Sequence, residues 1–331
     1  MSHFVQQQHT VNAFSSSDSW VILSPIEQSI KQKIEAVGVP LKDWDINIYR
    51  GVLTGCNEAF IINTDKRNEI LANCKDEAER KRTEELIRPI LRGRDIKRYG
   101  YEWAGLYLIA TFPARHYDIE QYPAVKEYLL SFAEDYLRKN GCEWVVDDYL
   151  ADFCKQKLSQ TGKFIIINGK ELTINGKKEK ARKKTSNKWF ETQDSISYWE
   201  DFDKPKIIFQ EIVQSSQFFY DDSIHYMCND TCRIIVGTHL PFILGILNSK
   251  LFFYAVKKFY GGGVLGEHGI RMKHTFFGNF PCLPYNKQIE DAAKELTNGC
   301  NTCIADQTDK LIFSAYSLTK KEISEIESEV I

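Results

Sequence analysis

The stretch DWDINIYRGVLTGCNEAF, residues 43–60, sets the fold class expected for this chain. Its apolar and β-branched side chains predict a strand over Asn47–Thr54, and a second strand is expected at Ala59–Ile62. Before the next predicted strand, Leu106–Thr111, the segment Asp65–Ile87 is charged and predicted to be helical. Irregular strands and segregated helices of this kind favour an α+β fold.

Further strands and helices are expected downstream. The strands are Phe164–Ile167, Lys206–Val213, Gln217–Asp221 and Cys232–Val236. The dipeptides Asn168-Gly169 and Asn175-Gly176 predict tight hairpin turns. The helices are Ile119–Lys139, with Val125, Leu129 and Phe132 on one face, the very apolar His239–Tyr260, and then Asn286–Leu296, Thr308–Tyr316 and Thr319–Glu329. We therefore expect a mixed, irregular β-sheet with packed helices and a C-terminal helical segment.

A short helix is predicted near the N-terminus, after a polar lead-in over residues 1–19. Ser24 can cap this helix, Pro25 suits its first turn and Glu27 completes a capping box. The helix is expected to end at Gly38 and Pro40.

Composition places the chain among globular proteins. Hydrophobic residues make up 43% of its 331 residues and charged residues 27%, which is enough to bury a core. Nine cysteines and the lack of a recognisable signal peptide favour reduced thiols in a cytoplasmic protein. The longest apolar stretch, Leu240–Val256, is interrupted by Asn248, Ser249 and Lys250, so we expect no membrane association.

The net charge of −2 conceals an uneven distribution. Between Lys163 and Lys188 there are nine basic residues and two acids, a net of +7. Between Arg88 and Arg98 there are five basic residues and one acid, a net of +4, whereas residues 286–331 have a net of −4. A near-neutral protein can therefore present a basic face to nucleic acid.

Two kinds of DNA contact are predicted from the basic segments. In the segment Leu91–Tyr99, arginine side chains and backbone N–H groups around Gly93 suit phosphate binding. A structural turn in which Asp95 pairs with an arginine is an equal alternative. The predicted phosphate-binding residues are Arg92, Arg94, Lys97, Arg98, Arg271 and Lys273. The segment 177–188 is expected to be an exposed loop, and its predicted base-reading residues are Lys177, Lys178, Arg182, Lys183, Lys184, Asn187 and Lys188. Gly261, Gly262 and Gly263 are expected to begin a flexible loop.

No catalytic residue or metal ligand is assigned from the sequence. There is no Pro-Pro pair of the kind that grips a flipped adenine, and no Walker A loop or nucleophile elbow. Asp203 and Glu211 flank a strand as in some nucleases, but Val213 stands where a lysine is needed. Cys300 and Cys303, with Cys228 and Cys232, have zinc-like spacing, but we interpret them as ordinary thiols.

Six blocks of sequence together resemble the TaqI-like C-terminal specificity domain of adenine-N6 DNA methyltransferases and type IIG restriction-modification enzymes. They are residues 43–60, 88–99 (RPILRGRDIKRY), 122–125 (YPAV), 204–212 (KPKIIFQEI), 229–231 (NDT) and 244–251 (LGILNSKL). The stretch between Trp144 and Trp199 matches no shared block, and base readout is expected on such variable loops held by a rigid frame.

The resemblance implies a target recognition domain that binds double-stranded DNA beside a methyltransferase domain, with or without a nuclease domain, in the same chain or in a separate one. S-adenosylmethionine would then be the cofactor of the parent enzyme, and none is expected on this chain. The expected organisation is a lead-in and linker helix (1–45), the recognition domain (46–285) and a C-terminal helical segment (286–331). The alternatives are a complete small nuclease or methyltransferase, or an assembly subunit that docks through its acidic C-terminal helices.

Overall fold

The computed structural model describes residues 23–142, 152–154, 156–158, 162–261, 264–265, 269–299 and 301–330. Several predictions fall outside this part of the chain. They concern the polar lead-in, the boundary residue Trp144, the loop glycines Gly262 and Gly263, and the side chain of Cys300.

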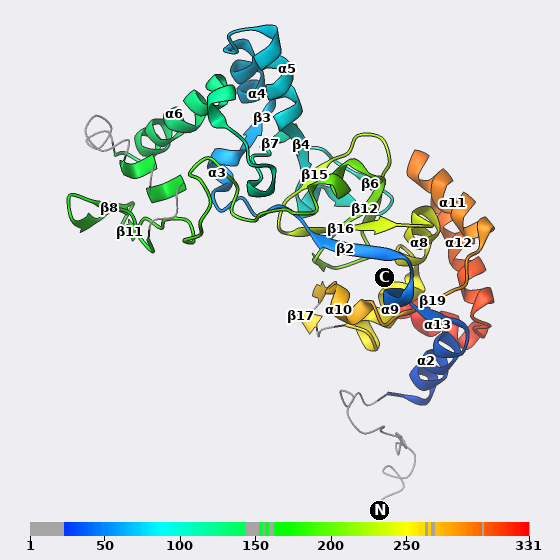
Figure 1. The fold of residues 1–331 in the computed structure, drawn as a ribbon. Helices are drawn as coiled ribbons and strands as arrows, with labels where there is room; N and C mark the ends of the chain where they lie inside the picture. The colour runs from blue at the N-terminus through cyan, green and yellow to red at the C-terminus, as the bar shows by residue number, and fades with distance from the viewer. Residues whose placement is uncertain are drawn as a thin grey trace, which may run out of the picture.

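A four-stranded antiparallel sheet stands at the centre of the molecule (Figure 1). Its strand order is β14 (Phe218–Asp221), β12 (Lys206–Gln210), β16 (Cys232–Gly237) and β2 (Ile46–Arg50). Along β12, Ile207 and Phe209 belong to one hydrophobic core and Ile208 to another, because successive side chains point to opposite faces. The sheet is therefore buried on both faces, which explains the unbroken apolar run of β12.

A second sheet lies on the side of the central sheet that carries the core of Ile208. Its order is β15 (Met227–Cys228), β4 (Ile87–Leu91), β7 (Leu106–Ile109) and β3 (Ile61–Asn63). The strand predicted at Ala59–Ile62 is wrong in its first half, where Asn57–Phe60 forms the helical turn α3. Thr54 causes this change, since its hydroxyl accepts from the Cys56 amide at 3.2 Å and bonds to the Asn57 side chain.

Three helices surround the second sheet. The predicted charged helix Asp65–Ile87 is present as α4 (Thr64–Ala72) and α5 (Glu77–Leu86). The predicted helix at Ile119–Lys139 is α6 (Pro123–Lys139), preceded by a turn of 3-10 helix. Val125, Leu129 and Phe132 are buried on one face of α6, as expected.

Two consecutive hairpins form the outer end of the molecule, beside α6 (Figure 1). They are β8 (Ile166–Ile167) with β9 (Lys170–Glu171), and β10 (Thr173–Ile174) with β11 (Lys177–Lys178). Asn168 and Gly169 have φ of 50° and 72°, and Asn175 and Gly176 have φ of 49° and 75°, which confirms both predicted turns. A small third core joins these hairpins to Ala133 and Leu137 of α6.

The most apolar segment forms two helices rather than the single helix predicted at His239–Tyr260. α8 (Leu240–Leu247) and α9 (Lys250–Lys258) meet at an angle of 64°. The break is fixed by Asn248, whose side chain bonds to both the N–H and C=O of Phe218, and by Ser249, which caps α9. In the part of the chain that the structure describes, no helix alone has the length and apolar content of a membrane span, although α8 and α9 together do across their bend.

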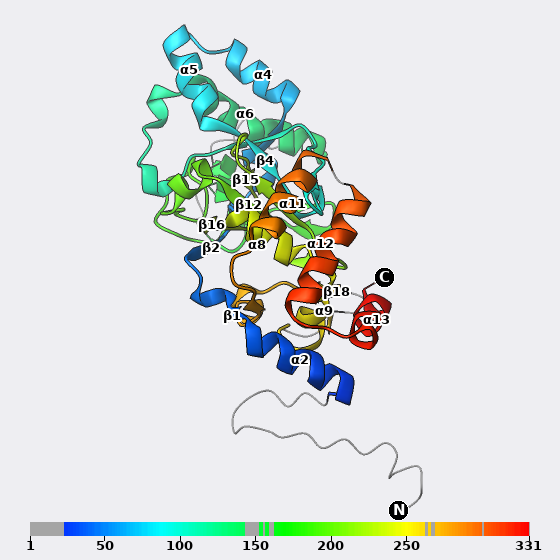
Figure 2. The same ribbon diagram turned by 90° about the vertical axis from the view of Figure 1, so that its right-hand side faces the viewer.

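Helices from both ends of the chain complete the core on the α8–α9 side. The predicted capping box is confirmed in α2 (Pro25–Val37), and the three predicted C-terminal helices are α11 (Lys287–Asn298), α12 (Thr302–Ala315) and α13 (Lys320–Glu329). Figure 2 shows α2 beside α13, where Lys33 forms an ion pair with Glu322 at 2.7 Å. Phe60 and Leu251 are fully buried and Trp44 stacks on Phe242, as expected of structural residues.

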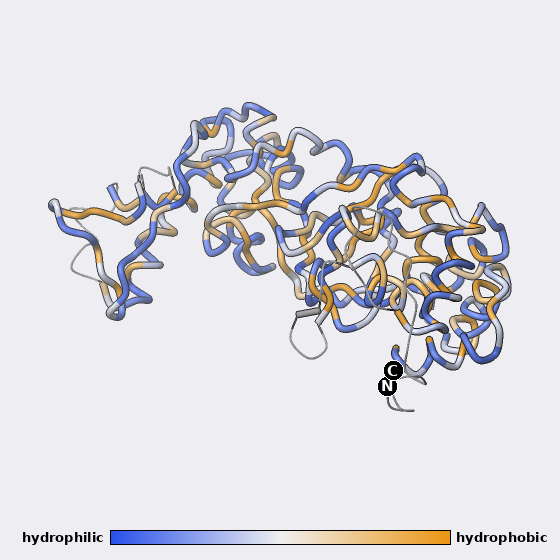
Figure 3. Tube along the Cα trace, turned by 90° about the horizontal axis from the view of Figure 1, so that it is seen from below, coloured by the Kyte–Doolittle hydropathy of each residue, from blue (hydrophilic) through white to orange (hydrophobic). Residues whose placement is uncertain are grey.

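Short elements connect these layers. They are β1 (Val39–Pro40), β19 (Pro281–Cys282), β5 (Ile96–Lys97), β6 (Gly100–Tyr101), β13 (Ile212–Val213), β17 (Val264–Leu265), β18 (Gly269–Arg271) and α10 (His274–Phe277). The result is the expected mixed α+β architecture. It is elongated, with the hairpins at one end and the C-terminal helices at the other (Figure 3).

Candidate nucleic-acid interface

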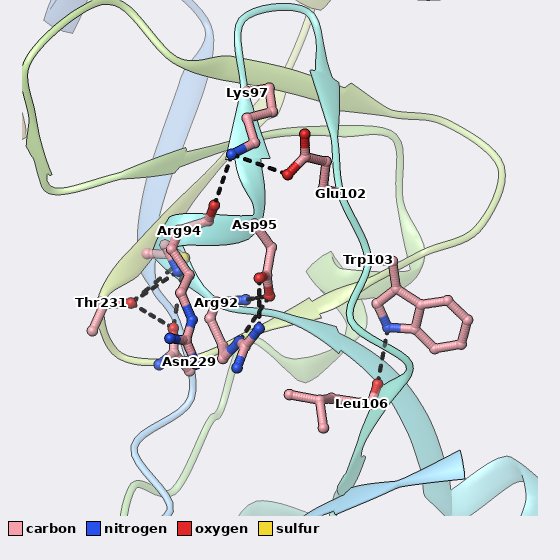
Figure 4. Close-up of polar contacts among 11 residues, drawn as sticks. Arg92, Arg94, Asp95, Lys97, Glu102, Trp103, Leu106, Asn229 and Thr231 are labelled. Carbon is pink, nitrogen blue, oxygen red and sulfur yellow. Dashed lines mark hydrogen bonds and ion pairs between the residues drawn. The ribbon is translucent and has the colours of Figure 1, made fainter.

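The turn that follows β4 is held together by an arginine–carboxylate pair. Arg92 donates from Nε and Nη2 to the two oxygens of Asp95, at 3.0 and 2.8 Å (Figure 4). Burial raises the pKa of the Asp95 carboxyl, but the hydrogen bonds from Arg92 outweigh burial and hold that pKa below its ordinary value. The alternative of a structural turn is therefore confirmed for Arg92.

The other cations of this turn differ in their partners. Lys97 lies 3.3 Å from Glu102, and Arg98 donates to the Asn248 carbonyl at 3.0 Å, which ties the turn to the α8–α9 bend. Arg94 is exposed, and no ion pair to it occurs among the residues that the structure describes. The Gly93 amide donates to Thr231 at 3.1 Å and so fixes the backbone beside Arg94. Arg94 is thus the most exposed cation of this turn.

The predicted phosphate contacts Arg271 and Lys273 lie beyond the central sheet, at β18 and just after it. Arg271 is about half exposed and donates to Glu211 at 2.8 Å, while Arg233 donates to the same carboxylate at 2.9 Å. Burial raises the pKa of Glu211, but the two arginines lower it further, so the carboxylate stays charged. Lys273 is half-buried over the ring of Phe276. Gly261 follows α9 and has no room for a side chain, since a Cβ would lie 2.2 Å from the Val256 carbonyl.

The segment 177–188 is not the single exposed loop that was predicted. Lys177 and Lys178 are exposed residues of β11, and Lys178 pairs with Glu171 in the neighbouring hairpin. Arg182 is buried, with 3% of its surface exposed, so it does not face solvent as expected of a residue in an exposed base-reading loop. Lys183, Lys184 and Lys188 are exposed, as expected.

Arg182 is held beneath the loop of residues 54–56. Its Nη2 donates to the Glu191 carbonyl at 2.6 Å, and its guanidinium lies over the ring of Phe60 at 5.2 Å. Burial lowers the pKa of Arg182 to about 10, so the side chain remains charged at neutral pH. We conclude that Arg182 anchors the start of the basic segment to the protein.

The remainder of the segment is anchored to the ends of two strands. The Asn187 side-chain amide donates to the carbonyls of Thr192 and Gln193 at 2.9 and 2.8 Å, so this nitrogen is already used inside the protein. The Thr192 amide donates to Thr111 beyond β7, and the Gln193 amide donates to Leu53 beyond β2. Lys183, Lys184 and Lys188 therefore lie between or beside residues that are bonded to the rest of the protein.

One cation beside this segment was missed in the sequence. Arg115 stacks on Trp199 at 4.0 Å from the ring centroid and also lies over Tyr117 at 5.2 Å. Lys188 donates to the Tyr117 carbonyl at 3.4 Å, so the two cations share one tyrosine. A search for runs of charge cannot find an isolated arginine, and the partner ring is distant in the sequence.

The side chains considered for catalysis or metal binding have structural environments. Asp203 pairs with Arg88 at 2.7 Å, and Asp203 and Glu211 lie beyond opposite ends of β12. Cys228 and Cys232 are buried, and burial raises the pKa of Cys228 well above its usual range. Cys303 is exposed. Within the described ranges, no three His, Cys, Asp or Glu side chains are arranged to hold a metal ion.

Comparison with known families confirms the resemblance noted in the sequence. Residues 152–265 match the family model of the TaqI-like C-terminal specificity domain. This range contains the basic segment 177–188, the central strands β12, β14 and β16, and the helices α8 and α9. No curated protein matches the chain.

Comparison with solved structures concerns the fold. The chain is similar to the type IIL restriction-modification enzyme MmeI, solved in complex with DNA, at 15% identity and a TM-score of 0.50. The match covers 87% of this chain and 35% of MmeI. The type IIG restriction endonuclease BpuSI is matched at 12% identity and a TM-score of 0.47, over 88% of this chain and 33% of BpuSI. This chain thus spans about a third of the length of either enzyme, and the similarity to MmeI shows a shared fold over that part.

Proposed function

We propose that this chain is the target recognition domain of an adenine-specific DNA methyltransferase or of a type IIG or IIL restriction-modification enzyme. In this role it reads a sequence in double-stranded DNA and performs no chemistry of its own. The observation that carries the proposal is the part of the basic segment from Arg182 to Lys188, which lies inside the range that matches the specificity-domain family. It presents Lys183, Lys184 and Lys188 to solvent from an anchored backbone.

The anchoring supports recognition rather than simple charge attraction. A base-reading side chain must reach a groove edge in a defined register, which requires a backbone fixed by the rest of the protein. Arg182 and Asn187 supply that fixation from below, and the exposed lysines lie between and beside them. The exposed lysines of the outer hairpins, Lys177 among them, extend the positive charge toward the end of the molecule.

In this proposal, residues outside the segment 182–188 also contact the DNA phosphates. Arg94 is the best placed of the turn after β4, because its neighbours Arg92 and Arg98 are engaged within the protein. Phosphates are common to all DNA, so such contacts set affinity and orientation without specifying a sequence. Arg271 adds charge at the opposite side of the central sheet, reduced by its pairing with Glu211.

The partner in this proposal is a methyltransferase domain, fused or separate, that binds S-adenosylmethionine and works in the cytoplasm. The chain matches about a third of MmeI and of BpuSI, which leaves the rest of such an enzyme to hold a separate methyltransferase domain. The alternative of a complete small enzyme differs in one measurable respect, since it requires methyl transfer or cleavage by this chain alone.

Selection from randomised duplexes tests the proposal. The chain, alone and together with its methyltransferase partner, is incubated with a random duplex library, and bound DNA is sequenced over several rounds. We expect enrichment of one short motif, and no transfer of labelled methyl groups from S-adenosylmethionine by the chain alone. Bound DNA without any enriched motif, or turnover by the isolated chain, would overturn the proposal.

A further inference from the structure

We propose that Arg115, held on the ring of Trp199, is a DNA phosphate contact that works together with Lys188. The guanidinium carbon lies 4.0 Å from the centroid of Trp199, closer than in any other cation–ring contact between described residues. This inference rests on the proposed function and adds a contact that neither charge runs nor shared sequence blocks indicate.

The backbone of Arg115 is fixed. Pro113–Arg115 form a turn of 3-10 helix directly after Phe112, which is buried at 2% exposure. The Ala114 amide donates to the Ser195 carbonyl at 3.2 Å, so the turn is bonded to the same segment that carries Trp199. Because the turn that carries Arg115 is bonded to the segment that carries Trp199, the position of the guanidinium over the indole ring is fixed.

Stacking leaves the edge of the guanidinium exposed. A planar arginine on an indole ring keeps its N–H groups directed outward, and this fork matches the oxygens of a phosphate. Arg115 is exposed, and no carboxylate forms an ion pair with it in the described part of the chain. Lys188 lies on the carbonyl of Tyr117, whose ring Arg115 covers, so a second cation stands beside the fork.

The neighbouring carboxylates have other partners. Asp118 caps the next 3-10 turn, and Glu200 interacts with Lys204. The ion pairs around the site are Asp203 with Arg88 at 2.7 Å, Asp201 with Lys204 at 2.7 Å and Glu120 with Lys126 at 2.6 Å. Neither Arg115 nor Lys188 forms an ion pair with a carboxylate in the described part of the chain, so both can contact an anion, and in a DNA-reading domain the anion is the phosphate backbone.

Equilibrium binding with four variants tests the assignment. The full chain is titrated with a labelled duplex carrying the selected motif and with a random duplex, between about 50 and 200 mM salt. For Arg115→Gln we expect about a tenfold loss of affinity on both duplexes. The slope of log affinity against log salt should fall by about one unit. Trp199→Leu should weaken binding on both duplexes while the salt slope stays unchanged, because the charge remains but is no longer positioned. Arg115→Lys should behave in the same way as Trp199→Leu.

Lys310→Gln is the control, since Lys310 is an exposed cation on α12 and should leave both quantities unchanged. Thermal unfolding of each variant separates loss of contact from loss of fold. An unchanged affinity and slope for a folded Arg115→Gln would overturn this assignment, and so would a loss confined to the selected motif. Failure of the unaltered chain to bind either duplex would instead overturn the proposed function, and this assignment with it.

Discussion

Gly55 and Arg182 are in contact although they are far apart in the sequence. A Cβ added to Gly55 would lie 2.8 Å from Nε of Arg182, and Gly55 itself has φ of +78°. The glycine lies outside residues 152–265, the range that matches the specificity-domain family, whereas the arginine lies inside that range and within the basic segment 177–188. The contact therefore joins the loop after β2 to the basic segment.

Substitution of Gly55 should disturb this junction. Gly55→Ala places a side chain at positive φ and against the guanidinium, so we expect the free energy of unfolding to fall by about 1–3 kcal/mol. Urea denaturation measures the change. Gly100→Ala is the matched control, because a Cβ there meets nothing within 4 Å, and it should change stability little. Equal stability of the two variants would mean that Arg182 can move away without loss.

Leu251 tests the packing of α9. The side chain is fully buried at the start of this helix, in the core shared with α8 and the C-terminal helices. Leu251→Ala should cost about 2–5 kcal/mol of unfolding free energy, because it removes buried methyl groups and leaves a cavity. Leu311→Ala, at a position 37% exposed on α12, should cost less than about 1 kcal/mol. A change near zero for Leu251 would place α9 at the periphery.

Glu322 should make the stability depend on pH. Burial raises the pKa of this carboxyl, but hydrogen bonds from Lys33, Ser29 and Thr319 outweigh burial and lower the pKa to about 2. A carboxyl depressed from 4.5 in this way stabilises the folded state above about pH 4.5, and the contribution is lost as the pH falls toward 2. We expect about 1–3 kcal/mol at neutral pH, measured by urea denaturation between pH 3 and 7.

Glu322→Gln should remove most of that pH dependence, whereas Glu325→Gln in the same helix should follow the unaltered chain. If both variants kept the same slope of stability against pH, the contact between α2 and α13 would contribute no such linkage.

Local signals predicted local structure well. The Asn-Gly pairs placed both hairpins because their turns require positive φ at two successive residues, and Ser24 and Glu27 placed the start of α2. The bend between α8 and α9 was missed, since it depends on Asn248 bonding to Phe218 from another strand. No window along the sequence contains that partner.

The candidate site likewise has features that the local sequence predicted and features that it could not predict. Exposure of Lys183, Lys184 and Lys188 followed from the polar composition of their segment, as predicted. Burial of Arg182 depends on the space above Gly55, and the stacking of Arg115 depends on Trp199, so both arise only when distant segments meet. Composition can thus indicate a basic surface. Only the folded structure distinguishes the cations that anchor the segment from those that face solvent.

Arg94 should act as a sequence-independent contact. The side chain is exposed on a turn fixed by Arg92 and Asp95, and an exposed guanidinium suits the phosphates that all DNA shares. Arg94→Ala in the complete enzyme should weaken binding to specific and random duplexes alike and reduce the salt slope by about one unit. Titrations at several salt concentrations measure both quantities, and a loss on the specific duplex alone would assign Arg94 to base reading instead.

Lys184 should contribute to sequence recognition. It is exposed, close in sequence to the buried Arg182, and it lies within the range that matches the specificity-domain family. An ammonium donor held in register at the major groove can bond to the O6 and N7 acceptors of guanine, and the lysine side chain supplies such a donor at Nζ. Lys184→Ala in the complete enzyme should therefore cost about 1–3 kcal/mol of binding free energy on the selected motif and little on random DNA. Lys310→Ala on α12 serves as the matched lysine control and should change neither affinity. If the Lys183 and Lys184 variants each lost both affinities equally, as is expected for Lys188 beside Arg115, the segment would contact phosphates only. Base reading would then have to come from elsewhere, and the residues around Arg271 and Lys273 would be the next to substitute.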